Sequence, residues 1–202
     1  MEQNSKHGQS DNQEIFEISR KIRGDNALSG ISGFSEEMTI SQVVRFFARR
    51  DIEFTKTMIQ NYVRIGLLPP PVDKRYYTVQ HLILLNLIHS LKSVYPLEDI
   101  KVLFRPILKD LSTFDDDVMD ISAIYEIYVK LYREALEDWE TGLPRLIFQL
   151  QNMVDGSSVV QADKPVVFRF ITILTLMAQS IASKRLANEL IAQWFEDGKN
   201  PQ

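Results

Sequence analysis

Seven polar and basic side chains between residues 56 and 75 have the types and the spacing that suit DNA binding. Five of them recur at helical intervals, so they lie on one side of a single helix, and two follow in a short turn. Lysine and arginine neutralise phosphates, whereas amide and hydroxyl side chains form hydrogen bonds with base edges. The side chains expected to face a major groove are Thr57, Gln60, Asn61 and Arg64, and those expected to contact phosphates are Lys56, Lys74 and Arg75.

The helix that positions these side chains is predicted over residues 55–65. Thr55 is a suitable N-cap, and Phe54 and Ile59 are spaced as a hydrophobic staple. The packing face of the helix consists of Met58, Ile59, Tyr62 and Ile65. Gly66 can supply a left-handed C-cap, and the three prolines that follow cannot continue a helix. The segment is therefore a short amphipathic helix with one face for a core and one for a partner.

The elements around this helix are predicted to be helical as well. Thr39 and Gln42 form a capping-box pattern at the start of a helix that ends near Arg50. The other predicted helices span about residues 14–23, 78–94, 96–104, 120–140, 144–154 with Pro144 in its first turn, and 165–195. Residues 1–13 are polar and are predicted to be mobile, and no strand is predicted outside the turn at 75–77. The sequence therefore predicts an all-α fold.

The chain also carries a series of short motifs in a recognisable order. They are TISQV at 39–43, IQNYVR at 59–64, IGLLPP at 65–70, YT at 77–78 and LEDI at 97–100. This order resembles that of the MerR-type winged helix-turn-helix regulators. A closer resemblance, to a bacterial family of domains of unknown function predicted to be MerR-like, rests on KTMIQNYV at 56–63, PPV at 70–72 and KRY at 74–76. The resemblance covers roughly residues 36–110 and implies a winged helix-turn-helix that binds double-stranded DNA and regulates transcription.

Three features depart from the family pattern. Gln60 stands where the family usually has a phosphate-binding arginine, so the charge-assisted strength of that contact is lost, although an amide can still bind phosphate or pair with adenine. The segment 49–54 is longer than the usual tight turn. The predicted wing at 72–77 is short and lacks the usual hairpin glycine. All three departures fall in parts expected to determine the contact with DNA.

The predicted domain organisation follows from this resemblance and from a polar loop at 112–117. Residues 1–35 are expected to be a flexible N-terminal segment with a possible helix, residues 36–111 a MerR-like helix-turn-helix domain, and residues 112–202 a helical domain for dimerisation or effector binding. The loop contains Asp115, Asp116 and Asp117, which lack the alternating spacing of a calcium loop and are expected to be solvated.

Charge is distributed unevenly along the 202-residue chain, whose formal net charge is −4. Residues 38–81 carry seven lysines and arginines against three acidic residues, a net charge of +4. Residues 110–160 carry three basic against eleven acidic residues, a net charge of −8. A positive surface on an otherwise acidic protein orients it toward phosphates. Arg49 and Arg50 belong to the basic region and could add contacts to the DNA backbone.

Aromatic and apolar residues dominate the C-terminal part of the chain. Tyr125, Tyr128 and Tyr132 recur at helical spacing, so they either line a pocket for an apolar effector or form a core stripe, the commoner use of such residues. Residues 166–178 are apolar on nearly all sides, yet Arg169 interrupts a run that is too short to span a membrane. Such a helix is expected at the centre of a bundle or between subunits, and we predict a homodimer that uses the C-terminal helices.

Composition disfavours several classes of function. The chain has no cysteine and three scattered histidines, so we expect no disulfide, metal site or cofactor. It has no glycine-rich phosphate loop, nucleophile elbow or histidine-centred acid–base pair, so we do not expect an enzyme. The N-terminus lacks the pattern of a secretory signal, which favours the cytoplasm. Any effector would be a small molecule or a protein, and the alternative to DNA binding is a protein-interaction adaptor with the same fold.

Overall fold

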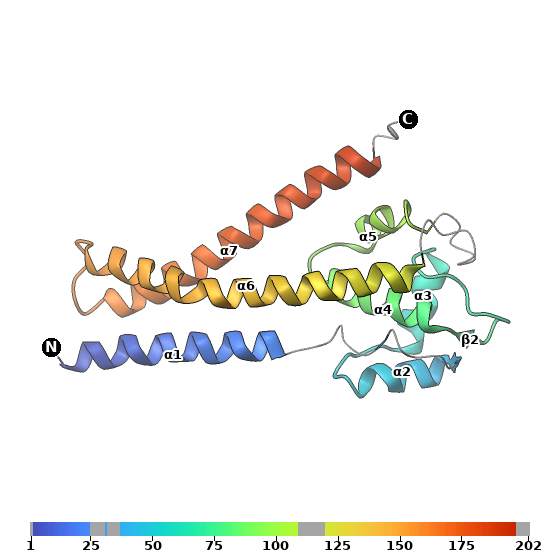
Figure 1. Cartoon of the computed structure of the whole chain (residues 1–202), viewed down its shortest axis with the longest axis horizontal. Coiled ribbons are helices and arrows are strands. Elements are labelled where there is room, and N and C mark those ends of the chain that lie inside the picture. The colour runs from blue at the N-terminus through green and yellow to red at the C-terminus, as the bar shows by residue number, and fades with distance from the viewer. Residues whose placement is uncertain (1, 25–30, 32–36, 109–119, 197–202) are drawn as a thin grey trace. The chain divides into compact units, whose positions relative to one another are not determined.

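The chain is built almost entirely from helices (Figure 1). The computed structural model describes residues 2–24, 31, 37–108 and 120–196. The helices are α1 (Glu2–Gly24), α2 (Ile40–Ala48), α3 (Lys56–Arg64), α4 (Val79–Leu91), α5 (Leu97–Phe104), α6 (Ile121–Asp155) and α7 (Lys164–Ile191), followed by a π-helical turn, η1 (Ala192–Glu196). Two short strands, β1 (Met38–Thr39) and β2 (Tyr76–Tyr77), pair antiparallel. The predicted all-α class is confirmed, whereas β1 is a strand that the sequence pattern does not predict.

The described helices form two compact units. Unit 1 comprises Met1–Asn26 and Leu131–Leu186, and unit 2 comprises Ala27–Lys130 and Ala187–Gln202. The loop predicted as a domain boundary, with its three aspartates, lies outside the described residues. The chain passes from one unit to the other inside α6 and again inside α7, so these units do not coincide with the predicted domains.

Unit 2 is organised around α4, because this helix is apolar on nearly every side. Leu82, Ile83, Leu84, Leu85 and Ile88 are completely buried. Phe47 of α2 and Ile59 of α3 are also completely buried, and the ring of Phe47 meets that of Phe54 edge to face at 4.8 Å between centroids. Full burial of an apolar side chain contributes about 1.5–3 kcal/mol relative to its exposure. This core therefore fixes α3 relative to α2 and α4.

Hydrogen bonds at the start of α4 hold the chain segment that follows α3 in place. Thr78 is the N-cap, as predicted, and its backbone N–H donates to Nδ1 of His81 at 3.0 Å. Because Nδ1 is an acceptor, the other ring nitrogen, Nε2, carries the proton and donates to the carbonyl oxygen of Pro70 at 3.1 Å. His81 is completely buried, and this burial lowers its pKa to about 4. A neutral imidazole therefore connects the proline segment to the first turn of α4.

Helices α2 and α3 end in the same backbone motif, a Schellman turn, but with different residues at its left-handed position. This residue is Gly66 after α3, with a φ of 66°, and Asp51 after α2, with a φ of 57°. The bonds that close the turns run from Leu67 N to Tyr62 O at 2.9 Å and from Ile52 N to Phe47 O at 3.1 Å. The predicted C-cap role of Gly66 is confirmed. Both turns direct an apolar side chain into the core, since Ile52 and Leu67 are buried.

Unit 1 has a smaller core, formed by α1, the C-terminal part of α6 and the start of α7. Ile147, Leu150, Val154 and Phe168 are buried in it, and Ile15 and Phe16 pack against them. Asp11 accepts two hydrogen bonds from Arg169, at 2.8 and 2.9 Å, and Arg23 pairs with Glu140 at 2.8 Å. The helix begins at Glu2, whereas the sequence predicts a helix only from about residue 14. Burial of Asp11 against Arg169 extends the docked part of α1 beyond the predicted helix.

Helix α6 is one helix of 35 residues, whereas the sequence predicts two helices with Pro144 opening the second. Proline in a helix interior removes a hydrogen bond and crowds the preceding turn, at a cost of about 3 kcal/mol. The helix continues through Pro144 because the residues around it, Leu143 and Ile147, are buried in unit 1. The predicted N-cap is confirmed, since Oδ1 of Asp120 accepts from the N–H of Ser122 at 2.9 Å.

Helix α7 leaves most of its apolar surface exposed. Its exposed apolar residues include Val166, Phe170, Ile173, Leu174, Met177 and Ile181. Every residue from 177 to 186 is exposed, so this part of α7 is not the centre of a bundle within the chain. By length and composition alone, Lys164–Phe195, with a mean hydropathy of 1.6 in its most apolar window, is also long and apolar enough to cross a membrane. The apolar surface of α7 is therefore available to a partner outside this chain.

Candidate nucleic-acid interface

Helix α3 separates its side chains into a packed face and an exposed face, as the sequence predicts. Ile59 and Tyr62 are 0% and 4% exposed. The exposed face carries Lys56, Thr57, Gln60 and Arg64, and Asn61 is half-buried at its edge. At the start of the helix, the N–H of Met58 donates to Oγ1 of Thr55 at 3.1 Å, which confirms the predicted N-cap. The predicted contact residues of α3 therefore share one solvent-facing surface.

Two of these contact residues bind each other. Nη2 of Arg64 donates to Oδ1 of Asn61 at 2.6 Å. An arginine has five N–H donors, so this bond orients the guanidinium and leaves other donors for a ligand. No described residue forms a hydrogen bond with the side chain of Gln60. The surface of α3 therefore combines a pre-oriented pair with an amide whose donors and acceptor are unused within the described part of the chain.

The segment before α3 is longer than a tight turn, but the core anchors it. Ile52 and Phe54 are each 3% exposed. Arg50 donates to the carbonyl oxygen of Phe46 at 3.3 Å, and its guanidinium lies 3.8 Å from the centroid of the Phe46 ring. These contacts hold the Arg50 side chain against α2, whereas Arg49 is exposed. Of the two arginines predicted as additional contacts to the DNA backbone, Arg49 is the one presented to solvent.

A small hairpin between the three prolines and α4 presents Lys74 and Arg75 to solvent. Val72 and Tyr76 exchange two backbone hydrogen bonds, at 2.8 and 2.9 Å. Asp73 and Lys74 have φ angles of 50° and 58°, so the turn adopts left-handed backbone without glycine. A left-handed residue that carries a side chain costs about 1–2 kcal/mol. The turn thus spends backbone strain to place an exposed cationic side chain, Lys74, at the tip of the hairpin.

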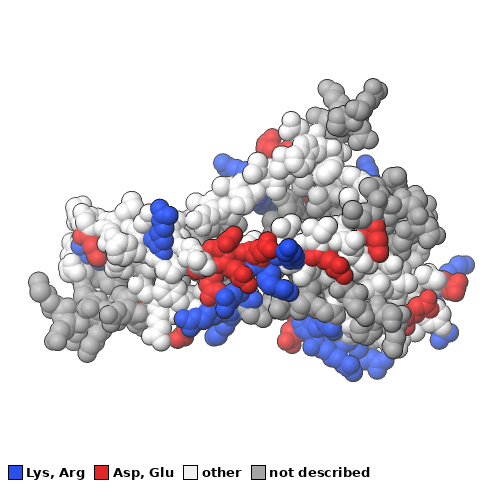
Figure 2. Space-filling view, in the orientation of Figure 1, with Lys and Arg blue, Asp and Glu red and all other residues white. Residues whose placement is uncertain are grey.

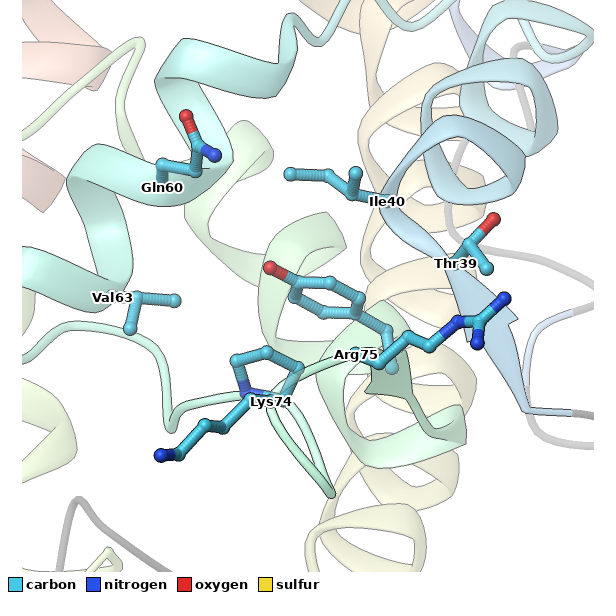
Figure 3. Close-up of a pocket in the computed structure, with 8 residues that line it drawn as sticks. Thr39, Ile40, Gln60, Val63, Lys74 and Arg75 are labelled. Atoms are coloured by element: carbon cyan, nitrogen blue, oxygen red, sulfur yellow. The ribbon is translucent and has the colours of Figure 1, made fainter.

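A pocket of about 400 Å³ lies between α3, the start of α2 and the hairpin (Figure 3). It is lined by Gln60 and Val63 of α3, Thr39 and Ile40 at the junction of β1 and α2, Lys74 and Arg75 of the hairpin, and Pro71 and Tyr77. Figure 3 shows Lys74 and Arg75 extending from the hairpin in opposite directions. The pocket therefore brings three of the predicted contact residues, Gln60, Lys74 and Arg75, around one cavity that also has apolar walls.

The N-terminal end of α2 borders this pocket. The N–H of Thr39 donates to Oε1 of Gln42 at 2.8 Å, and the Thr39 hydroxyl donates to the same oxygen at 2.7 Å, which confirms the predicted pairing of these residues. The first N–H groups of a helix have no partner within the helix, and the aligned peptide dipoles make this end partially positive. The wall of the pocket formed by Thr39 and Ile40 is therefore favourable to an anion.

Tyr77 is the most deeply buried polar side chain of the pocket lining. It is 4% exposed, and its ring meets that of His81 edge to face at 5.2 Å between centroids. Burial raises the pKa of the Tyr77 phenol, so the group stays a neutral O–H donor near pH 7. Within the described ranges of the chain, no residue forms a hydrogen bond with this hydroxyl. The pocket lining therefore includes a phenol O–H donor that no described residue bonds.

Lysine and arginine side chains gather over α2, and acidic side chains gather along α6 (Figure 2). Most basic residues between 38 and 81 are exposed, namely Arg45, Arg49, Lys56, Arg64, Lys74 and Arg75. The positive charge found in this part of the sequence is thus also positive charge on the surface of unit 2. Exposed charges of this kind act over about one Debye length, roughly 8 Å at physiological salt.

The three tyrosines predicted as a possible effector pocket do not share one environment. Tyr125 is 1% exposed and accepts a hydrogen bond from Nδ2 of Asn86 at 2.9 Å within the core of unit 2. Tyr128 packs partly buried against the same core, whereas Tyr132 is exposed and belongs to unit 1. None of the three lines the pocket described above. The alternative of a core stripe therefore fits Tyr125 and Tyr128.

The sequence pattern assigns neither Val63 nor Pro71 to a site, and it also misses three lining residues that lie outside α3 and the proline segment: Thr39 as a site residue, Ile40 and Tyr77. Their place beside α3 depends on the pairing of β1 with β2, in which Met38 lies opposite Tyr77. Periodicity and capping signals report contacts between neighbours in the sequence and carry no information on such a pairing. Lys101 of α5 was missed for the same reason, although its Nζ donates to the carbonyl oxygen of Ile65 at the end of α3, at 2.6 Å.

Residues 35–128 match DUF1836, described as a domain of unknown function. The matched segment begins just before β1, ends within α6 and includes every residue of the candidate interface. No curated protein and no solved structure matches the chain. The geometry of the interface is therefore the basis for a functional proposal.

Proposed function

We propose that residues 36–111 form a MerR-like winged helix-turn-helix that binds double-stranded DNA and regulates transcription. In this proposal α2 and α3 are the helix pair, the hairpin at 72–76 is the wing, and the exposed face of α3 enters the major groove. The groove-facing residues are Thr57, Gln60, Asn61 and Arg64, and the phosphate contacts are Lys56, Lys74 and Arg75. The observation that carries the proposal is the exposed polar face of α3 beside a basic hairpin in left-handed conformation.

Rigid support of α3 favours this proposal over a flexible binding segment. Its packing face is buried, its start is capped by Thr55, and its end is closed by Gly66 and by the ammonium of Lys101. A recognition element gains affinity when its bound conformation exists before binding, because less entropy is lost. The polar face of α3 is therefore presented in a fixed orientation.

Charge supports a nucleic acid as the partner of this surface. The basic side chains of unit 2 between residues 38 and 81 are mostly exposed, while the chain as a whole is acidic. A localised positive surface accelerates encounter with phosphates and releases counterions on binding, which makes affinity fall with added salt. Such a regulator would act in the cytoplasm, where the sequence analysis places the chain.

We further propose that the protein acts as a homodimer that uses α7. Val166, Phe170, Ile173 and Met177 are all exposed and follow the alternating three- and four-residue spacing of a coiled-coil seam. A helix whose residues are all exposed, as at 177–186, is marginally stable in water without a packing partner. Two copies would also place two α3 helices on half-sites about 34–36 Å apart, the spacing that helix-turn-helix dimers require.

The test of the proposal is selection of bound fragments from a random double-stranded DNA library, followed by titration at several salt concentrations. We expect an enriched palindrome and salt-sensitive binding. Arg64→Ala and Lys74→Gly should each reduce the salt slope by about one unit, and Gln60→Ala should change the sequence preference. Glycine is the sharper replacement for Lys74, because it removes the charge and also relieves the left-handed strain. Arg20→Ala, an exposed charge on α1, is the matched control and should leave binding unchanged.

The alternative of a protein-interaction adaptor makes the opposite prediction for the same variants. An adaptor would use the exposed face of α3 for a protein and would show no enriched DNA sequence at low salt. Unchanged DNA binding in the Arg64, Lys74 and Gln60 variants, with the fold intact by circular dichroism, would overturn the assignment of this surface to DNA.

A further inference from the structure

We propose that the pocket between α3, the start of α2 and the hairpin binds a small organic anion. The charged group of the ligand would lie against the hairpin cations and the N-terminal end of α2, and its apolar part against the aliphatic walls. The cationic residues are Lys74 and Arg75, and the aliphatic residues are Ile40, Val63 and Pro71. Binding itself is independent of the proposed DNA contact, whereas its consequence for regulation rests on that proposed function.

The cationic side of the pocket suits a phosphate or carboxylate group. Lys74 and Arg75 are exposed, so their charges are available at the opening. Hydrogen bonds from charged donors to an anion are shorter and stronger than neutral ones, and an arginine can bind both oxygens of one group. The partially positive end of α2, at Thr39 and Ile40, also lines the pocket. Two independent elements therefore favour negative charge in the same cavity.

The hydroxyl of Tyr77 adds a neutral hydrogen-bond donor to the charged side of the pocket. The side chain is 4% exposed, and no residue in the described part of the chain accepts or donates a hydrogen bond at this oxygen. A phenol O–H in a pocket wall that no described residue bonds is a neutral donor that a ligand oxygen can use. A ligand oxygen in the pocket would satisfy the Tyr77 O–H.

Size and lining indicate an organic ligand rather than an inorganic ion. The pocket has a volume of about 400 Å³, within the range of small-molecule sites. Its aliphatic walls offer nothing to a bare phosphate but can cover an apolar ring or a short chain. The amide of Gln60, which no described residue bonds, adds two N–H donors and a carbonyl acceptor at the opening. The lining therefore fits an aromatic or short-chain phosphate or carboxylate.

Occupation of this pocket would compete with DNA if the proposed function holds. Gln60, Lys74 and Arg75 line the pocket and are also proposed contacts with DNA. A ligand that engages them reduces the apparent affinity for DNA, and by linkage DNA reduces the affinity for the ligand equally. A phosphate of the DNA backbone carries the same charged group, so the test must separate a free ligand from the backbone.

The experiment is a titration of the full chain, without DNA, with phenyl phosphate, inorganic phosphate and phenol. Methyl NMR signals of Ile40 and Val63 report on the aliphatic walls. We expect saturable shifts with phenyl phosphate, and affinities at least about tenfold weaker for the other two probes, because each lacks one half of the ligand. Equal affinity for phenyl phosphate and inorganic phosphate, or no saturable shift, would overturn the proposal.

Three variants test whether phenyl phosphate binds in this pocket. Tyr77→Phe removes only the hydroxyl and should weaken phenyl phosphate binding about tenfold. Gln60→Glu adds a negative charge at an exposed position, so it should abolish binding without disturbing the core. Arg20→Ala removes an exposed charge of α1 that does not line the pocket and should leave the affinity unchanged. Unchanged binding in both Tyr77→Phe and Gln60→Glu would show that the ligand lies elsewhere.

A second arm adds the selected DNA and separates the two proposals. Phenyl phosphate should weaken DNA binding by wild type several-fold and by Tyr77→Phe much less. Ligand binding without any DNA binding would support the pocket and contradict the proposed function. DNA binding that protects the Ile40 and Val63 signals, with no response to phenyl phosphate alone, would assign the cavity to the DNA backbone and overturn the small-molecule site.

Discussion

Helix α3 buries its apolar residues, whereas helix α7 exposes most of its own. Ile59 of α3 is 0% exposed, whereas Phe170 and Met177 of α7 are 60% and 56% exposed. Helix α3 is short, and a helix of that length owes its stability to tertiary packing on its apolar face. Most of α7 has no such packing against the described residues. The comparison teaches that packing within unit 2 fixes α3, whereas the exposed part of α7 would be covered only in the proposed dimer.

The largest effect should come from the same substitution made on both helices. Ile59→Ala should lower the free energy of unfolding by about 2–5 kcal/mol, because it leaves a cavity in the core of unit 2. Ile181→Ala on α7 removes the same atoms from an exposed site and should change it by no more than about 0.5 kcal/mol in dilute monomer. Chemical denaturation measures both values, and equal losses of stability would contradict the expected difference between the two helices.

Acid should weaken the attachment of α3 without affecting α7. The pKa of His81 is 6.5 in the unfolded chain and about 4 in the fold, because burial disfavours the imidazolium. Between these values the unfolded state binds a proton that the folded state does not. Stability therefore falls as pH decreases from about 6.5 to 4 and levels off below, a loss of about 3 kcal/mol.

His81→Gln is the control for this pH dependence. Glutamine keeps an acceptor for the N–H of Thr78 but does not titrate. His89, whose pKa is lowered by burial and by Lys92, titrates in the same direction, so the difference between wild type and His81→Gln isolates His81. Helix α7 contains no histidine, and self-association should not follow this transition. Identical pH profiles for the two proteins would contradict the role of the buried ring.

A charge on α7 should disrupt association and leave unit 2 folded. Phe170→Glu places a carboxylate on the exposed apolar stripe, and we expect a homodimer at least about tenfold weaker by analytical ultracentrifugation. Arg64→Ala on the exposed face of α3 should not change the dimer. A wild-type chain that stays monomeric and sediments with lipid vesicles would instead assign α7 to a membrane, as its length and hydropathy also allow.

The smallest effect concerns the turns that flank α3. Asp51→Gly should raise the free energy of unfolding by about 0.5–1 kcal/mol, because glycine adopts a φ of 57° without strain. Gly66→Ala, at the equivalent position after α3, should lower it by about 1 kcal/mol or more. Thermal unfolding of the two variants gives the comparison. The same sign of change in both would show that backbone strain does not govern these turns.

The features of α3 could be predicted because they are local. The cap at Thr55, the amphipathic spacing and the left-handed Gly66 each depend on residues within a few positions of one another. The continuation of α6 through Pro144 could not be predicted in this way. Local propensity favours a break there, and burial of Leu143 and Ile147 outweighs it.

The candidate site also has a part that the local sequence pattern predicts and a part that it does not. The exposed contacts of α3 and the hairpin follow from residue type and periodicity. The pocket does not, because it requires β1 and β2 to pair and so to bring Thr39 and Ile40 beside Tyr77. Likewise, the polar sequence at the start of α1 predicts a mobile segment. The residue that binds Asp11 there is Arg169, 158 positions further along the chain. Contacts of long sequence separation have no signature in a local pattern.

Because Asp11 and Arg169 lie far apart in the sequence, their contact can form only late in translation. The two residues are 158 positions apart, so at about 5–20 residues per second roughly 8–30 s separate their synthesis. During most of that interval Ile15 and Phe16 of the nascent chain lack the residues they pack against, which begin at Ile147. The buried cluster of unit 2 ends at Tyr125 and can close earlier. Translation order therefore completes the candidate interface before the unit that carries the proposed subunit contact.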